Sequence, residues 1–543
     1  MSELHDLTLA QAAGQIAKRE LSPTEYTDAL IARSEALQPQ LNTFITQTFE
    51  QARKSAKKAT EQIANGNYHG PLHGVPFAVK DIYDTAGVLT SGHSRTCIDR
   101  VPDKDATCVT RLHDAGAILT GKLATHEFAH GGPSFDLPWP PARNPWNTAH
   151  FTGGSSSGSG AAAAAGLAPI TLGSDTGGSI RSPAGLCGVA GMKPTYGLVS
   201  RAGVLPNSFT YDHCGPLART AEDCALILNA IAGHDPTDPA SSPAPVGDLT
   251  AGIADGIKGL RIGVIRHFWE TDMRTHPDLG PAMENAIAVF KHLGAIVDEI
   301  DLRPMQHYLD VKIVTAESEL FSIHLKELRA RPEAFGQDFR GRALAACLFT
   351  SEDYVRASRC RRFITSEMDN IYRRYDLMLT ANTSAAPRID KHDILSFWTS
   401  ASLTTPFDVT GGPALALPCG FTADGLPLSL QVVGRPFDDA TVLRAGHAFE
   451  KETGFWTARP DLTIGDLPAA VDPQMWVPDT SAVDPGIRAH VESAAKIAGL
   501  NLPPEIMEEL VAVAPHALAM AGRLPRDHVQ YDEVSSVFMP SGR

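Results

Sequence analysis

The chain has 543 residues, of which 43% are hydrophobic, and its formal net charge is −15 at pH 7. This is enough apolar material for one large domain with appendages, or for two to four smaller ones. The acidic balance argues against a general nucleic-acid binder, because phosphate backbones are held by basic patches. The densest basic stretch, 359–363, is better explained as a solvated helix face.

The first segment, residues 1–65, is predicted to be helical. Ser22 can cap one of its helices, with Pro23 at the first helical position and Glu25 in the first turn. The N-terminus has apolar residues at helical spacing but no continuous apolar run, which predicts no signal peptide, and no stretch approaches the ~18 apolar residues of a membrane span. Eight cysteines without C-x-x-C spacing suit a reducing compartment and no zinc site. We therefore expect a cytoplasmic protein.

The second segment, residues 66–465, alternates short β-like runs with helical patterns, which predicts an α/β catalytic domain. Strands are expected in "PFAV", "AILTG", "PITLGSD", "GLRIGVI" and "DLMLTA", and a strand, turn, strand and helix within 411–450. A proline-punctuated linker (466–485) and a C-terminal helical tail (486–543) follow. The tail is too small to hold much core alone, so we expect it to pack on the main domain or on a second chain.

The stretch "HFTGGSSSGSGAAAAAG" (150–166) has several interpretations. It runs into a strong helix former, unlike a flexible linker, and it lacks the lysine of a phosphate-binding loop and the third glycine of a dinucleotide fingerprint. "GSSSG" also fits a nucleophile elbow with Ser156 at its centre and "HGG" upstream. The elbow needs a preceding strand, and "NPWNTAHFTG" is loop-like.

A better nucleophile site lies in "PITLGSDTGGSIRSPAG" (169–185), where a buried strand leads into a glycine turn. Two glycines before Ser179 allow successive N–H groups to point at one spot, and such a nest can stabilise an oxyanion. Lys80 ends the apolar run "GVPFAVK", where a buried charge is costly unless it is neutralised or bonded. Alone, each feature fits an ordinary turn or a surface lysine.

Together these segments resemble the amidase signature family of serine hydrolases. The match includes "GVPFAVKD", "GGSSSGSGAAAAAG", "GSDTGGSIRSPAGLCGVAGMKPTYG", "DHCGPLART" and "GGPALALPCGF", and covers roughly residues 1–460. The resemblance implies a large mixed β-sheet with helices on both faces, and a catalytic trio of Lys80, Ser155 and Ser179. It also implies a cis peptide after Gly154, and neither a metal nor an organic cofactor.

The resemblance also implies the surroundings of the trio. The oxyanion would be held by the backbone N–H groups of Thr176, Gly177, Gly178 and Ser179. Supporting positions are Ser156, Asp175 and Arg181, although a purely structural Asp–Arg pair explains the last two equally well. Aromatic residues that could line an apolar substrate pocket are Phe135, Trp139, Phe397 and Trp398.

The family leaves the substrate open among amides, carbamates and urea-like compounds. The favoured hypothesis is a self-contained homodimeric hydrolase of a small-molecule substrate, with no nucleic-acid or membrane partner. The alternatives are a glutaminase-type A subunit of an amidotransferase, a catalytically silent binding or assembly protein, and, more distantly, the Ser156 elbow hydrolase. The tail is similar to small helical companion chains related to the amidotransferase C subunit, some of which accompany enzymes acting on carboxylated biuret or similar urea derivatives. A generic C-terminal pair of helices is the competing interpretation.

Overall fold

The protein is built around one mixed β-sheet, seen in a computed structural model that describes residues 3–529 and 532–534. The remaining residues of the predicted C-terminal tail lie outside this range. The strands of the sheet are β1 (Phe44–Gln47), β2 (Pro76–Lys80), β3 (Ile118–Leu123), β4 (Ile170–Asp175), β5 (Ala190–Lys193), β6 (His213–Ala218), β7 (Arg261–Val264), β8 (Ile296–Glu299), β9 (Leu377–Thr383), β10 (Ala414–Phe421) and β11 (Pro427–Gly434).

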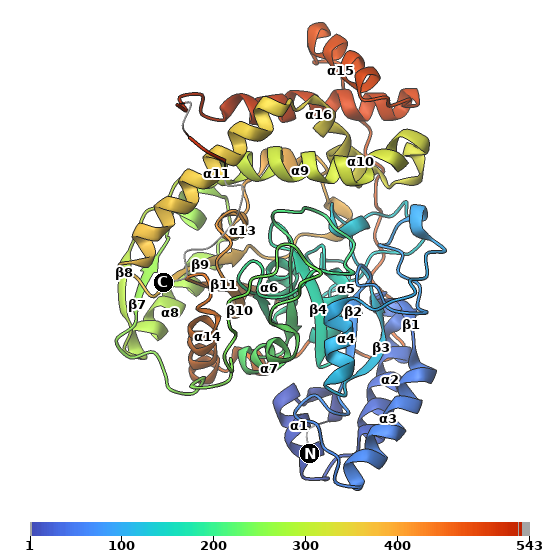
Figure 1. Cartoon of the computed structure of the whole chain (residues 1–543), viewed down its shortest axis with the longest axis vertical. Coiled ribbons are helices and arrows are strands. Elements are labelled where there is room, and N and C mark those ends of the chain that lie inside the picture. Colours follow the sequence, from blue (N-terminus) through green and yellow to red (C-terminus); the bar gives the residue numbers. More distant parts are fainter. Residues whose placement is uncertain (1–2, 530–531, 535–543) are drawn as a thin grey trace.

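The eleven strands lie in the order β1-β3-β2-β4-β6-β5-β10-β11-β9-β7-β8 (Figure 1). Strand β2 is parallel to both β3 and β4, and β7 is parallel to both β8 and β9, while the central strands pair antiparallel. The sheet is therefore mixed, and the predicted α/β fold with a large mixed sheet is confirmed. The strand expected in "PITLGSD" is β4, which lies between β2 and β6 in the sheet.

Helices cover both faces of the sheet. One face carries α5 and α6, and the other carries α7, α8 and α14. The α-helices are α1 (Leu9–Ala17), α2 (Pro23–Leu41), α3 (Phe49–Ala64), α4 (Thr107–Asp114), α5 (Ser157–Ala164), α6 (Arg181–Cys187), α7 (Ala221–Ile231), α8 (Leu279–His292), α9 (Met305–Ala330), α10 (Gln337–Ala343), α11 (Ser351–Tyr372), α12 (Ser396–Thr399), α13 (Thr405–Val409), α14 (Asp439–Thr453), α15 (Pro485–Ile497) and α16 (Pro504–Arg523).

The serine- and glycine-rich stretch forms helix α5, every residue of which is buried. Its glycines allow close contact with neighbouring backbone. A Cβ atom at Gly158 would lie 2.5 Å from the backbone nitrogen of Ala124, and one at Gly160 would lie 2.8 Å from the carbonyl oxygen of Pro183. The glycine- and serine-rich composition, which is also typical of linkers, therefore permits tight packing of α5 against the backbone around Ala124 and Pro183.

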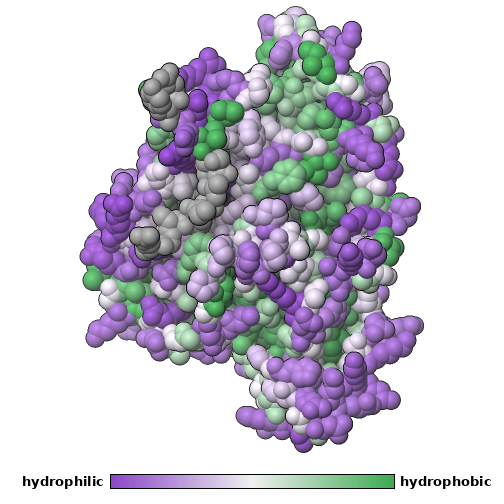
Figure 2. Space-filling view, in the orientation of Figure 1, coloured by the Kyte–Doolittle hydropathy of each residue, from purple (hydrophilic) through white to green (hydrophobic). Residues whose placement is uncertain are grey.

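The two ends of the chain differ in how they join the sheet. At the N-terminal end, Ser22 caps α2 as expected, but the segment predicted to be helical also contributes the edge strand β1. At the C-terminal end, α16 packs on α9 and α10, α15 packs on α16, and the apolar residues of all four helices belong to the same buried cluster (Figure 1). Figure 2 shows hydrophilic residues over the N-terminal helices and a larger share of hydrophobic residues beside α10 and α16.

Candidate active site

Lys80 ends strand β2 with its side chain fully buried. Its Nζ donates hydrogen bonds to the hydroxyl oxygens of Ser155 (2.7 Å) and Ser174 (2.9 Å). Burial lowers the pKa of Lys80 to about 7, because the charged form loses its hydration, although Asp212 and Asp175 favour the charged form. A lysine with this pKa can act as a base near neutral pH.

Ser155 and Ser179 lie on the two segments that flank this lysine. The peptide bond between Gly154 and Ser155 is cis, and the N–H of Ser156 donates to the carbonyl oxygen of Ser179 (3.2 Å), which ties the segments together. Ser179 is half-buried and lines a cavity of about 330 Å³. Its hydroxyl has no hydrogen-bond partner among the described residues, so it is available to a substrate in that cavity.

The glycine turn before Ser179 presents fewer free N–H groups than the sequence predicts. The N–H of Gly178 donates to Asp175 Oδ1 (2.6 Å) and is therefore engaged. The N–H groups of Gly177 and Ser179 have no acceptor among the described residues, and Gly177 lies on the cavity wall. Thr176 is held from its side chain, which donates to Asp212 (2.6 Å).

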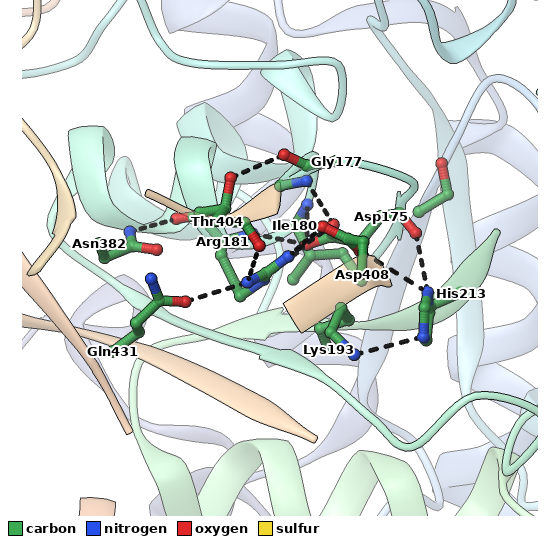
Figure 3. Close-up of polar contacts among 12 residues, drawn as sticks. Asp175, Gly177, Ile180, Arg181, Lys193, His213, Asn382, Thr404, Asp408 and Gln431 are labelled. Carbon is green, nitrogen blue, oxygen red and sulfur yellow. Dashed lines mark hydrogen bonds and ion pairs between the residues drawn. The ribbon is translucent and has the colours of Figure 1, made fainter. Parts of the chain in front are cut away.

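A buried ion network holds this turn in place (Figure 3). Asp175 accepts from the backbone N–H of Ile180 (3.1 Å) and from Arg181 Nε (3.1 Å) and Nη2 (3.1 Å). Arg181 also donates to Asp408 (2.6 Å) and to Gln431 (2.9 Å). Burial opposes the charge on Asp175, yet Arg181 holds the pKa of that carboxyl well below its usual range. Burial and the neighbouring Asp175 raise the pKa of Asp408.

The remaining supporting position predicted from the sequence, Ser156, is fully buried beside β4. Its hydroxyl donates to the carbonyl oxygen of Ser174 (3.2 Å) and accepts from the N–H of the same residue (3.2 Å). No strand precedes Ser156 in the segment 144–154. This position is that of a packing residue rather than of a nucleophile on an elbow.

The cavity is also lined by guanidinium and imidazole groups that no sequence motif indicates. Arg342, Arg388 and His392 line the cavity together with Ser179. Arg342 is paired with Asp338 through Nε (2.9 Å) and Nη2 (3.3 Å), which leaves Nη1 without a partner among the described residues. One guanidinium nitrogen thus remains available to a ligand.

A second imidazole, that of His126, also lines the cavity. Its Nδ1 donates to the carbonyl oxygen of Gly131 (2.6 Å), a tautomer assigned from this contact. Burial lowers the pKa of His126 to about 3, so the ring is neutral and its Nε2 is an acceptor. Its edge lies against Gly154, where a Cβ atom would be 2.5 Å from that nitrogen.

The four aromatic residues predicted for an apolar pocket do not line this cavity. Trp398 is 3% exposed and belongs to the core, where its Nε1 donates to the carbonyl oxygen of Gly341 (3.1 Å). Phe397 lies behind the cavity wall under Arg342, whose guanidinium carbon is 4.3 Å from the ring centroid. Phe135 lines a neighbouring hollow, and Trp139 packs against His93.

The fold and the paired lysine and serine define a serine hydrolase of the amidase class. The family model described as Amidase matches residues 25–443. The chain therefore belongs to the amidase signature family, whose enzymes act on carbon–nitrogen bonds. Helices α15 and α16 lie beyond the matched residues.

Curated relatives include A subunits of glutamyl-tRNA(Gln) amidotransferases. The chain is 40% identical over 489 residues to the A subunit of glutamyl-tRNA(Gln) amidotransferase from Chloroflexus aggregans, covering 85% of this chain and 99% of the relative. It is 39% identical over 488 residues to the corresponding protein of Moorella thermoacetica, covering 85% of this chain and 100% of the relative.

Solved structures share the fold. One, from a vestigial protein complex bearing on the origins of an s-triazine catabolic enzyme, has a TM-score of 0.78 at 33% identity and covers 84% of this chain and all of that chain. The peptide amidase of Stenotrophomonas maltophilia has a TM-score of 0.74 at 30% identity, covering 85% and 98%. The A subunit of the glutamyl-tRNA(Gln) amidotransferase of Thermotoga maritima has a TM-score of 0.70 at 30% identity, covering 86% and 98%.

These relatives correct one prediction. The expected homodimer with only a small-molecule partner is contradicted, because the curated relatives are named as the A subunit of an amidotransferase, a name that implies further subunits. They also favour the amidotransferase alternative over the stand-alone hydrolase. Within the described residues, no helix is long and apolar enough to cross a membrane.

Proposed function

We propose that this chain is the ammonia-releasing subunit of an amidotransferase, hydrolysing the carboxamide of a small substrate that carries a carboxylate, such as glutamine. The observation that carries the proposal is the buried Lys80–Ser155 pair beside Ser179, on a cavity that is also lined by Arg342 with its one unpaired guanidinium nitrogen. Guanidinium groups suit carboxylate recognition because of their planar donor geometry. The names of the curated relatives support the same assignment.

In the proposed reaction, neutral Lys80 takes a proton from Ser155, which takes one from Ser179. Ser179 Oγ attacks the amide carbon, and the N–H groups of Thr176, Gly177 and Ser179 hold the oxyanion, with that of Gly178 joining only if Asp175 releases it. The proton returns through Ser155 to the leaving nitrogen, which departs as ammonia. Water then attacks the acyl-enzyme, losing its proton to the same relay, and frees the carboxylic acid.

Two hydrogen bonds of the proposed mechanism would form only when the substrate is bound. The hydroxyls of Ser155 and Ser179 are not hydrogen-bonded to each other in this state, and such bonds commonly tighten in the substrate complex. The neutral ring of His126 offers its Nε2 as an acceptor for an N–H of the substrate amide. A primary amide has two such hydrogens, which suits ammonia as the product.

A stand-alone amide, carbamate or urea-derivative hydrolase is the second candidate, and the similarity to the peptide amidase and to the s-triazine complex favours it. Ammonia release from glutamine and from neutral butyramide distinguishes the two. We expect kcat/KM for glutamine to exceed that for butyramide at least about tenfold, because Nη1 of Arg342 can bind the carboxylate of glutamine, which butyramide lacks. Ser179→Ala controls for background. Equal rates on both amides would contradict the proposal.

A further inference from the structure

One side of helix α10 contributes Arg342 to the lining of the cavity beside Ser179. Asp338 accepts a hydrogen bond from the backbone N–H of Gly132 (2.6 Å) and contacts His392. Arg342, one turn further along α10, is ion-paired with Asp338 and reaches the cavity. The position of this short helix therefore sets where the cationic group of the cavity stands relative to Ser179.

The other side of α10 is held by helix α16. Glu509 of α16 is 4% exposed and accepts three hydrogen bonds from α10. Two come from Arg340, through Nε (2.9 Å) and Nη2 (2.8 Å), and one comes from the amide of Gln337 (3.0 Å). This bidentate carboxylate–guanidinium contact fixes direction as well as distance.

The segment before α15 adds a second attachment. The backbone of Trp476 exchanges two hydrogen bonds with the side chain of Gln337, at 2.9 Å and 2.7 Å. At its N-terminal end α10 is also held by the main domain, since the N–H of Gly336 donates to Glu127 (2.8 Å) and that of Gln337 to Asp136 (2.9 Å). Helix α10 is thus hydrogen-bonded to both the catalytic domain and the C-terminal extension, residues 466–523.

We infer that Glu509 is a positioning residue for substrate binding, which acts from the C-terminal extension through α10 on Arg342. The inference rests on the proposed function, because it assigns Arg342 to the carboxylate of the substrate. Losing the Glu509 charge weakens the contacts of Arg340 to α16, although Arg340 still donates to the carbonyl oxygen of Phe335 (2.5 Å), and lets α10 shift, which misplaces Arg342 without touching the Lys80 relay. The extension, which lies beyond the family match, is then part of the substrate site rather than a separate appendage.

The test compares Glu509→Gln with Glu508→Gln in the full chain. Glu508 is the matched control, because its carboxylate pairs with Arg488 (2.6 and 2.9 Å) and Thr480 (2.6 Å), all within the extension. Hydrogen–deuterium exchange of residues 337–343 should increase in Glu509→Gln and stay unchanged in Glu508→Gln. Unchanged exchange in Glu509→Gln would overturn the inference whatever the substrate is.

Kinetics then separate positioning from general damage. We expect KM for glutamine to rise about tenfold in Glu509→Gln, with kcat and the rate of Ser179 labelling by a neutral fluorophosphonate kept within about twofold. An equal loss of kcat and labelling would mean structural damage and would also overturn the inference. If the wild-type protein hydrolyses butyramide as fast as glutamine, the proposed function fails, and the exchange experiment still decides whether Glu509 holds α10.

Discussion

Two buried lysines on neighbouring strands have opposite surroundings. Lys80 on β2 contacts two hydroxyl groups, those of Ser155 and Ser174. Lys122 on β3 lies 3.4 Å from the carboxylate of Asp81, and it donates to the carbonyl oxygen of Tyr83 (2.5 Å) and to a threonine hydroxyl. Both side chains are fully buried, and burial lowers the pKa of each.

The difference lies in what the neighbours can do when the lysine loses its proton. A carboxylate and a carbonyl oxygen can only accept, so they favour a charged Lys122. A hydroxyl can donate as well as accept, so Ser155 remains bonded to Lys80 in either protonation state. Burial lowers the pKa of both lysines, but Lys122 also contacts a carboxylate, whereas the contacts of Lys80 are to two hydroxyl groups. This distinction can be tested by removing each charge in turn.

The largest expected effect is on activity at Lys80. Lys80→Met should lower the rate of Ser179 modification by a fluorophosphonate at least about 10³-fold, because the base is lost. Its melting temperature should be equal to or above that of the wild type, since an apolar chain of similar size replaces a buried amine. Peptide mass spectrometry of the adduct and thermal unfolding measure the two quantities. Retained labelling would contradict the relay.

The reverse pattern is expected at Lys122. Lys122→Met should destabilise the protein by about 3–5 kcal/mol, because the buried carboxylate of Asp81 loses its cation and keeps only its hydrogen bonds from Ser91. Denaturant unfolding measures this loss, while labelling of the folded fraction should stay within severalfold of wild type. In the double variant Lys122→Met/Asp81→Asn most of the stability should return. A stable single variant would show that the pair is not a structural necessity.

Much of the fold could be predicted because its strands are short apolar runs bounded by glycine and proline. The expected strands near Lys80 and Ser179 are β2 and β4. Strand β1 could not be separated from the helices around it, since four residues carry little periodicity. The three candidate catalytic residues could be predicted because each lies in a contiguous segment that carries the family resemblance: Lys80 in an apolar run, and Ser155 and Ser179 among glycines and serines.

The rest of the site comes from distant segments that carry no local pattern. Asp408 and Gln431 reach Arg181 across 227 and 250 positions of sequence, and neither lies in a motif that predicts an ion network. Arg342 lies on a helix of seven residues, and although its i,i+4 pairing with Asp338 is a local contact, nothing in the sequence places it on the cavity wall. Ser174 lies inside a matched motif, but nothing in the sequence indicates that its hydroxyl, like that of Ser155, contacts Lys80.

A smaller effect is expected on the pH dependence of Ser179 labelling. The rate of Ser179 labelling should rise about tenfold per unit as pH increases toward about 7 and then level off, because only neutral Lys80 can accept a proton. In Ser174→Ala the midpoint should move to lower pH, since one acceptor for the charged form is lost. Asp81→Asn, beside Lys122, should leave the midpoint in place. A flat profile between about pH 5 and 9 would assign the base to another group.

The smallest effect is expected at Ser156, which also decides between two nucleophiles. Its hydroxyl makes two hydrogen bonds to the backbone of Ser174, so Ser156→Ala should cost about 1 kcal/mol of stability. Labelling should still occur on Ser179, at a rate within severalfold of wild type. Abolished labelling in a folded Ser156→Ala protein, with labelling retained in Ser179→Ala, would instead support Ser156 as the nucleophile of an elbow. Because Ser156 is fully buried and Ser179 borders the cavity, only Ser179 can meet a reagent without a change in the fold.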